Sequence, residues 1–405
     1  MKTVYLEQNL RKIVTTQVLS HINRKALLSG VSPVVFRQDL PDPPLPGPRW
    51  VRVRNLQTGI CGSDLTLFSC TADAWNLFEP LNARPRVYLG HETIGVVEEV
   101  GDHVTNLRPG DRVSLMRYTP SCAGKEIDPP CRFCQEGNYA LCEHYNDPGP
   151  RSLPDTGAGM GDSYLATEEQ LYPVSPQLND DRAVLLEPMA VAVHSVLRHP
   201  PAPGDTVLVY GTGAVGLLVV AALKILFPHC RIAVPVRGAG KKALALSFGG
   251  DEVFTGDVYQ HVAELTGGRL YRGMKGYAMM GGGMDVIYDT LGRGKNTHDC
   301  LRLLRARGVY VKIGYQMNRT RYDETPLWFK ELTMTGVSSH GMEILPDGRR
   351  VSSFKLAEEL LLSAKCPPVE QLITHRFPLS QYRDAFGLLL KPGSGAIKVV
   401  LDCQK

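Results

Sequence analysis

The stretch TVLVYGTGAVGLLVVAALKIL, residues 206–226, decides the fold of this chain. A strand-like apolar run enters three glycines spaced G-x-G-x-x-G, and an apolar run typical of a buried helix follows. In such a turn the first glycine allows tight bending, the second lets a pyrophosphate approach, and the third lets helix and strand pack closely. The backbone N–H groups at the start of the helix add hydrogen-bond donors and positive partial charge, which favour a bound phosphate. The stretch therefore predicts a dinucleotide-binding turn, made by Gly211, Gly213, Ala214, Val215 and Gly216.

The apolar character of residues 206–227 leaves a membrane span as an alternative. Three glycines and Lys224 interrupt a run that is barely long enough to cross a bilayer, so a buried strand and helix are favoured. Further apolar runs at 248–254, 284–292 and 308–314 alternate with helical patterns. This alternation predicts a doubly wound parallel sheet.

The strand after this turn bears on the choice between NAD and NADP. An NAD site usually has an acidic residue at the end of that strand, where it binds the ribose 2′-hydroxyl. This chain has Pro235 and Val236 there, followed by Arg237. An arginine can bind a 2′-phosphate through its planar guanidinium group, so the pattern favours NADP over NAD. Lys241 and Lys242 either add to this site or form the solvated start of a helix.

Three separate phrases, GICGSDL, LGHE and LLEPM, contain Cys61, His91 and Glu187. A thiolate, an imidazole and a carboxylate are ligands that hold zinc while leaving a fourth position open for a substrate oxygen. Each residue alone commonly packs or hydrogen-bonds locally, and the alternative is that the three bind no metal. Together they indicate a catalytic zinc site.

With these phrases the chain resembles the zinc-dependent medium-chain dehydrogenases, which act on alcohols, polyols, glucose and threonine. The resemblance covers most of the length and includes VTNLRPGDRV at 104–113, EPMAVAVH at 187–194 and GAIKVVL at 395–401. It implies an α/β protein with a GroES-like β-rich catalytic domain and a Rossmann doubly wound parallel-sheet cofactor domain. The expected boundaries are 1–190 with 341–405 for the catalytic domain, and 191–340 for the cofactor domain.

The resemblance also implies roles for residues near the expected metal. Cys61, His91 and Glu187 correspond to the ligands of the catalytic zinc, and Glu92 to a carboxylate that approaches it. Asp64 corresponds to the partner of His91, in keeping with the carboxylate that generally fixes the orientation of a ligating histidine. Many members have cysteine at the third ligand position, so Glu187 favours the polyol, glucose and threonine branches.

The implied reaction is reversible oxidation of an alcohol to a ketone or aldehyde, with hydride transfer to NAD(P). Ser63 corresponds to the hydroxyl that relays the proton, and the expected substrate is a polyol, a sugar or an amino alcohol. Two alternatives are a zinc-free quinone or enone reductase of the same superfamily and a non-catalytic dinucleotide-binding protein. The joint presence of all three ligand types argues against both.

Four of the ten cysteines lie close together in the chain. Family members often carry a structural zinc here, bound by cysteines spaced C-x2-C-x2-C-x7-C, and Cys131, Cys134 and Cys142 match the last three. Asp128 stands at the first position, while Cys122 lies six residues earlier. Either could be the fourth ligand, and we favour Cys122. Disulfides and free thiols are the alternatives.

Composition describes an ordinary globular protein of two domains, with 405 residues, 43% of them hydrophobic and 21% charged. A net charge of +4 with interspersed signs gives no indication of nucleic-acid binding. The first residues hold no apolar segment typical of a signal peptide, which predicts a cytoplasmic protein without a membrane partner. The expected partner is a small alcohol or carbonyl compound, and the resemblance implies a homodimer or homotetramer.

Two segments differ from the family pattern. Residues 267–283 look like an insertion, and their glycines predict a loop of unassigned role. The stretch between Leu65 and His91 is also longer than usual. Its aromatic residues Trp75, Phe78 and Tyr88 either line the substrate pocket or belong to the core.

Overall fold

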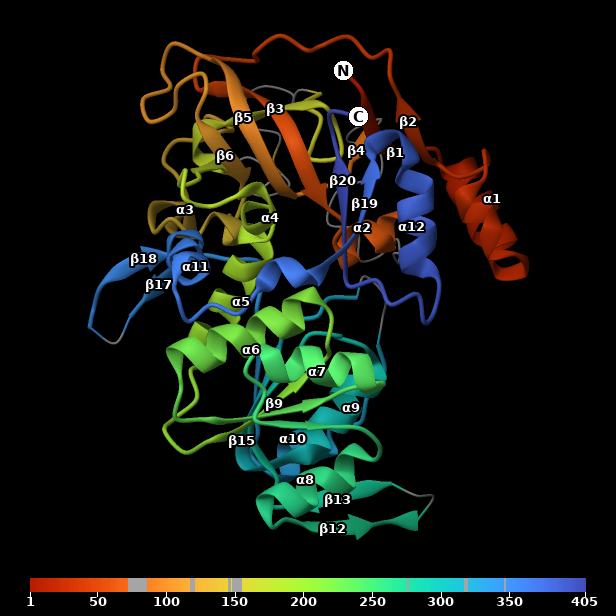
Figure 1. The fold of residues 1–405 in the computed structure, drawn as a ribbon, viewed down its shortest axis with the longest axis vertical. Helices are drawn as coiled ribbons and strands as arrows, with labels where there is room; N and C mark the ends of the chain where they lie inside the picture. The colour runs from red at the N-terminus through yellow and green to blue at the C-terminus, as the bar shows by residue number, and fades with distance from the viewer. Residues whose placement is uncertain are drawn as a thin grey trace. The chain divides into compact units, whose positions relative to one another are not determined.

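The computed structural model describes residues 1–71, 86–116, 121–144, 147, 155–274, 277–316, 320–345 and 347–405. The chain divides into two compact units, Met1–Glu187 with Glu370–Lys405, and Pro188–Val369. Figure 1 follows the chain through both units. The trace returns to the first unit at Glu370, whereas the sequence predicted this return at 341.

The first unit is built on a seven-stranded sheet in the order β19-β20-β3-β5-β6-β8, with β7 paired to β3. The strands are β3 (Trp50–Gly59), β5 (Glu92–Val100), β6 (Arg112–Leu115), β7 (Ser163–Thr167), β8 (Leu171–Pro173), β19 (Ile373–Pro378) and β20 (Lys398–Asp402). Alternate residues of β3, among them Val51 and Val53, are fully buried in one apolar core. The C-terminal strand β20 pairs with β3, so the two ends of the sequence build one sheet.

A smaller three-stranded sheet and several helices complete this unit. The sheet contains β1 (Thr3–Glu7), β2 (Val34–Arg37) and β4 (Arg86–Tyr88). The helices are α1 (Leu10–Ile22), α2 (Gly62–Phe68), α3 (Arg132–Gln135), α4 (Asp180–Ala183) and α12 (Tyr382–Leu390), and α5 (Leu186–Arg198) crosses into the second unit. The rings of Phe68 on α2 and Phe386 on α12 stack with centroids 4.1 Å apart. This contact holds α2, which is capped by Cys61, against α12.

The second unit contains a six-stranded parallel sheet in the order β11-β10-β9-β14-β15-β16. Its strands are β9 (Thr206–Tyr210), β10 (Arg231–Pro235), β11 (Glu252–Phe254), β14 (Met284–Asp289), β15 (Leu304–Lys312) and β16 (Thr333–Gly336). The connecting helices are α6 (Ala214–Leu226), α7 (Ala239–Ser247), α8 (Val258–Thr266), α9 (Gly294–Leu303) and α10 (Thr325–Phe329). The apolar stretch at 206–226 thus forms β9 and α6, as predicted from its glycine spacing.

Within 267–283, residues 269–272 and 278–281 form two paired strands, so the prediction of a loop was wrong for them. Strand β12 (Arg269–Arg272) pairs antiparallel with β13 (Ala278–Gly281). Leu270 and Met280 face each other in this pairing and both pack into the core of the parallel sheet. Apolar residues at alternate positions give the segment a buried face, and this outweighs the tendency of its glycines to form a loop.

Residues 341–369 belong to the second unit because a buried polar network holds them there. They form β17 (Met342–Ile344), β18 (Arg350–Ser352) and α11 (Ser353–Leu362). The carboxylate of Glu343 on β17 lies 2.6 Å from Nδ1 of His194 on α5 and accepts a hydrogen bond from the Ser353 hydroxyl.

No helix in the described part of the chain combines the length and the apolar character that crossing a bilayer requires.

Candidate metal and cofactor sites

Two neighbouring strands bring Cys61 and His91 together. Cys61 is the N-cap of α2 and follows the end of β3, while His91 precedes β5. The strands pair antiparallel, with Gly59 opposite Glu92. The loop that leaves β3 and the loop that enters β5 therefore meet at the same edge of the sheet.

The ligand atoms of Cys61, His91 and Glu92 all lie within 4.8 Å of one another. The sequence predicted Cys61, His91 and Glu187 as the trio, so the structure brings Glu92 into this group in addition to the two predicted residues. Glu187 lies in the first turn of α5, is buried, and acts electrostatically on His91. It belongs to the same region of the molecule without being a member of the tight group.

Asp64 holds both ligand loops in place. One carboxylate oxygen accepts a hydrogen bond from the backbone N–H of Cys61 at 2.9 Å, and the other accepts from Gly90 N–H at 3.0 Å. That second oxygen also lies 3.9 Å from Nδ1 of His91, a distance within reach of an ion pair but longer than a hydrogen bond. The resemblance implied that Asp64 is the partner of His91, and the structure shows hydrogen bonds from two backbone N–H groups to its carboxylate.

The electrostatic field of this site suits a cation. Burial opposes the charged form of His91, but the negative charges of Cys61, Asp64 and Glu187 raise its pKa well above the ordinary value. Burial, with Glu92 and Asp64, raises the pKa of Glu187 to about 7, while His91 and Lys398 act in the opposite direction. Several buried acidic groups thus converge around one imidazole. A thiolate, an imidazole and carboxylates in such a field fit a zinc ion.

Sequence reasoning missed Lys398, which pairs with Glu92 inside the protein. The Nζ of Lys398 lies 2.6 Å from Oε1 of Glu92, is also bonded to Oε2, and donates to the Ile60 carbonyl at 3.3 Å. Burial opposes a charged lysine, yet Glu92 and Cys61 raise the pKa of Lys398. The available signal was the single lysine in the otherwise apolar phrase GAIKVVL at 395–401.

Replacing Lys398 by methionine is expected to lower the free energy of unfolding by about 3–5 kcal/mol, because it leaves the Glu92 carboxylate buried without its partner. The side chains of the pair are only 4% and 1% exposed. Urea unfolding followed by circular dichroism measures the change. As a matched control, Lys405→Met removes a pair to Asp402 in which the lysine is 74% exposed. This control should cost less than about 0.5 kcal/mol, and equal losses in both variants would contradict the prediction.

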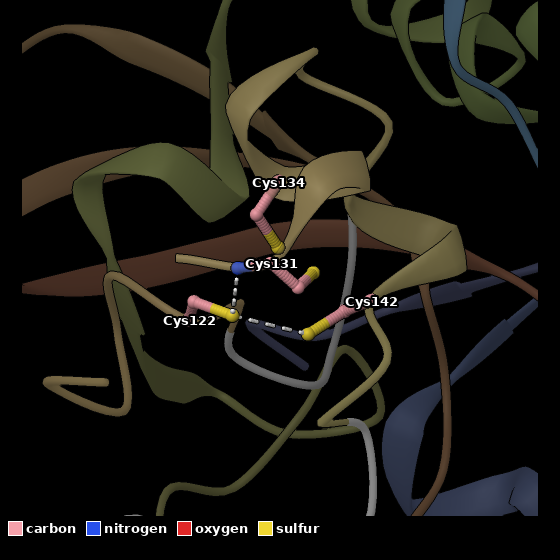
Figure 2. A group of neighbouring side chains, drawn as sticks. All are labelled: Cys122, Cys131, Cys134 and Cys142. Carbon is pink, nitrogen blue, oxygen red and sulfur yellow. Dashed lines mark hydrogen bonds between the residues drawn. The ribbon is translucent and has the colours of Figure 1, made fainter. Parts of the chain in front are cut away.

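The four cysteines of the second cluster converge in one place (Figure 2). The Sγ atoms of Cys122, Cys131, Cys134 and Cys142 lie within 4.8 Å of one another, and those of Cys122 and Cys142 are 3.6 Å apart. Zinc–sulfur bonds of 2.3 Å in a tetrahedron place the sulfurs about 3.8 Å apart. All ten cysteines of the chain are free. Asp128, the alternative fourth ligand, is exposed and is not a member of this group.

Backbone amides favour ionised sulfur at one position of this cluster, Cys131. Burial disfavours a thiolate at Cys131, but amide N–H groups of Glu143 and Cys134 lower the pKa of Cys131 to about 6. The Cys131 N–H in turn donates to Cys122 Sγ at 3.4 Å. Four cysteine sulfurs at these distances fit a closed structural zinc site.

The glycine turn after β9 has the geometry that a dinucleotide requires. Gly211 has a φ of +124°, and a Cβ on Gly216 would lie 2.0 Å from the Gly211 carbonyl oxygen, so neither position accepts a side chain. Gly213 caps α6, and a Cβ there would meet nothing within 4 Å. The turn is therefore tightly packed on its inner side and open at Gly213, where a pyrophosphate would approach the first N–H groups of α6.

Arg237 lies two residues after β10, and β10 pairs with β9, the strand that leads into this turn. It is exposed, and its charge acts on Tyr210, the residue before Gly211. Burial raises the pKa of Tyr210 to about 12, and Arg237 acts in the opposite direction. The guanidinium group is thus within electrostatic range of the turn.

The remaining predicted residues have simple positions. Ser63 lies in the first turn of α2, two residues after Cys61, and is partly exposed. The hydroxyl of Tyr88 donates to Asp155 at 2.5 Å and its ring contacts Tyr5 edge to face, which indicates a structural role. Trp75 and Phe78 lie outside the described residues.

Comparison with known proteins identifies the family. Residues 47–176 match the alcohol dehydrogenase GroES-like domain, and residues 214–350 match the zinc-binding dehydrogenase domain. A probable D-xylulose reductase A of Aspergillus fumigatus is 30% identical over 386 residues, which are 94% of this chain and 97% of that protein. The chain belongs to the zinc-dependent medium-chain dehydrogenase family.

Further comparisons agree with this. The dehydrogenase is 29% identical to a sorbitol dehydrogenase of Arabidopsis thaliana over 383 residues, 94% of this chain and 95% of that one. The crystal structure of 2R,3R-butanediol dehydrogenase from Bacillus subtilis has the same fold, with a TM-score of 0.69 and 23% identity over 99% of both chains.

Family membership confirms the α/β fold with its GroES-like and Rossmann parts. It also confirms an NAD(P)-dependent oxidoreductase of the alcohol dehydrogenase type, which uses zinc and a nicotinamide cofactor.

Proposed function

We propose that this dehydrogenase oxidises a polyol, a sugar or an amino alcohol to a ketone or aldehyde, and catalyses the reverse reduction, with NADP as the preferred cofactor. The observation that carries the proposal is the grouping of thiolate, imidazole and carboxylate atoms within 4.8 Å at Cys61, His91 and Glu92, with Glu187 close by. The relatives described above are named for a sugar and a polyol, which supports this substrate class.

Cys61 and His91 would bind the catalytic zinc, and Glu187 is the carboxylate that we propose as the third protein ligand. Both oxygens of Glu92 accept hydrogen bonds from Lys398, so this carboxylate is already compensated by a cation. Glu187 is buried and feels the charges of His91 and Lys398, but within the described residues its carboxylate forms no salt bridge. A zinc ion would supply a positive charge in direct contact with it.

Zinc bound here supplies a Lewis acid for the alcohol oxygen. Asp64 keeps the loops of Cys61 and His91 in register through its two backbone hydrogen bonds. Ser63, partly exposed in the first turn of α2, would pass the alcohol proton toward solvent. The turn at residues 211–216 would bind the cofactor pyrophosphate.

The substrate class is tested with purified, zinc-loaded enzyme and a panel of xylitol, sorbitol, glucose, threonine and ethanol, each with NADP and with NAD. We expect turnover with at least one polyol, sugar or amino alcohol, and a kcat/KM for ethanol lower by about two orders of magnitude, since a site that hydrogen-bonds extra hydroxyl groups discriminates strongly against a substrate without them. Ethanol as the best substrate would contradict the proposed class.

Replacing Arg237 by alanine is expected to raise KM for NADPH about tenfold or more, because a charge-assisted hydrogen bond to the 2′-phosphate is lost. KM for NADH, which lacks this phosphate, should stay within about twofold. Lys365→Ala, which replaces an exposed lysine after α11 in the same unit, is the control and should leave both values nearly unchanged. Equal effects of Arg237→Ala on both cofactors, or a wild type that prefers NADH, would exclude this role.

A homodimer or homotetramer and a cytoplasmic location complete the proposal. Ten free cysteines suit a reducing compartment. Sedimentation velocity of the purified protein tests the oligomer, and a monomer at micromolar concentration would contradict it.

A further inference from the structure

The strand order of the parallel sheet identifies the position where a ligand should bind. From β9 the chain adds β10 and β11 on one side, while β14, β15 and β16 lie on the other. In open α/β sheets ligands bind outside the carboxyl ends of the strands at such a switch point, here between β9 and β14. Asp289 is the last residue of β14 and pairs in register with Tyr210, the last residue of β9.

The Asp289 carboxylate is fully buried and accepts three hydrogen bonds, two from the turn after β14 and one from β15. One oxygen accepts from the N–H groups of Leu291 at 2.9 Å and Gly292 at 3.2 Å. The other accepts from the Tyr310 hydroxyl on β15 at 2.8 Å, and this hydroxyl lies 3.0 Å from the Thr297 hydroxyl on α9. The carboxylate thus ties the turn after β14 to the neighbouring strand and helix.

That turn packs directly on the glycine turn of the cofactor site. The N–H and the hydroxyl of Thr290 both donate to the Tyr210 carbonyl, at 3.0 and 3.2 Å. A Cβ on Gly211 would lie 2.3 Å from the Thr290 hydroxyl oxygen. The position of residues 290–292 therefore sets the space available beside Gly211.

We propose that Asp289 is a positioning residue for the nicotinamide cofactor, which holds residues 290–292 against Gly211 without touching the cofactor itself. The inference rests on the proposed cofactor turn at residues 211–216. A carboxylate suits this position because it only accepts hydrogen bonds and can satisfy three donors at once. An asparagine would keep one acceptor oxygen and present an N–H₂ group on its other side.

Strand order makes the inference distinguishable from the proposed role of Arg237. Arg237 follows β10, on one side of β9, and Asp289 ends β14, on the other side. Disturbing Asp289 should therefore weaken NADPH and NADH by the same factor, whereas loss of Arg237 should weaken NADPH alone.

The test is titration of zinc-loaded enzyme with NADPH and with NADH, followed by cofactor fluorescence. We expect Asp289→Ala to raise both dissociation constants about tenfold, and Tyr310→Phe to raise them about threefold, in line with the loss of buried hydrogen bonds. Asp289→Asn should recover part of the loss. At saturating cofactor, kcat should fall less than about threefold.

Lys330→Met is the matched control for a general loss of stability. Lys330 is also buried, but its Nζ donates to the carbonyls of Arg302 at 2.9 Å and Leu304 at 2.6 Å, at the amino end of β15. This variant should lower the melting temperature and leave both dissociation constants unchanged. Unchanged cofactor binding in the Asp289 variants, or equal weakening in Lys330→Met, would overturn the inference. If the wild type bound neither cofactor, the proposed cofactor turn itself would fail.

Discussion

Replacing His91 by asparagine is expected to remove one zinc ion per chain and to lower kcat/KM at least about a thousandfold. The imidazole is one of the donors gathered within 4.8 Å, and its loss leaves Cys61 and carboxylates to hold the ion. A thousandfold loss corresponds to about 4 kcal/mol of transition-state stabilisation, which is in the range expected when a Lewis acid is lost. Elemental analysis should give two zinc ions in the wild type and one in the variant.

His103→Asn is the control for this prediction, because His103 is exposed in the same unit. It should keep both zinc ions and full activity. Glu187→Gln provides a second arm, which is expected to lose the same ion and most of the activity if Glu187 is the third ligand. A His91 variant that kept both zinc and turnover would exclude the proposed zinc site. A Glu187 variant with both zinc ions would exclude only the choice of the third ligand.

Replacing Cys122 by alanine is expected to remove the other zinc ion and to lower the melting temperature by roughly 10 °C. Its sulfur lies 3.6 Å from that of Cys142, inside a cluster whose packing is made largely by the cysteines themselves. Since structural zinc contributes directly to folding free energy, a loss of several kcal/mol follows, at about 2–4 °C per kcal/mol for a domain of this size. Differential scanning calorimetry with zinc analysis measures both effects.

Asp128→Ala separates the two candidates for the fourth ligand. Asp128 is exposed, so this variant should retain both zinc ions and a melting temperature close to that of the wild type. The opposite pattern, with zinc lost from Asp128→Ala and kept in Cys122→Ala, would assign the site to the carboxylate.

The glycine turn between β9 and α6 could be predicted from the sequence because its determinants are local. A strand, three glycines and a helix follow one another within 206–226, and each glycine acts on its immediate neighbours. The strand pair formed by residues 269–272 and 278–281 shows the limit of such reasoning. Its glycines suggested a loop, yet the burial of Leu270 and Met280 against the parallel sheet gives it strand structure.

The candidate metal site also has a part that the sequence predicted and a part that it did not. Cys61 and His91 stand in phrases whose pattern indicates their chemistry, and the structure brings their ligand atoms together. Lys398 was not predicted, because its partner Glu92 lies 306 residues away in the chain. The two meet only because β20 and β5 both pair with β3, and hydrophobic periodicity does not specify which distant strands pair.

By itself, the sequence determined the glycine turn and the family, and it predicted Cys61 and His91 as metal ligands, since these depend on residues near one another or on matching phrases. Only the tertiary structure decided that Lys398 compensates Glu92, that Cys122 rather than Asp128 lies with the other three cysteines, and that Asp289 lies buried beside the glycine turn. The physical reason is that the pairing of buried charges and sulfurs depends on strand register and loop closure between distant segments, which local patterns leave open.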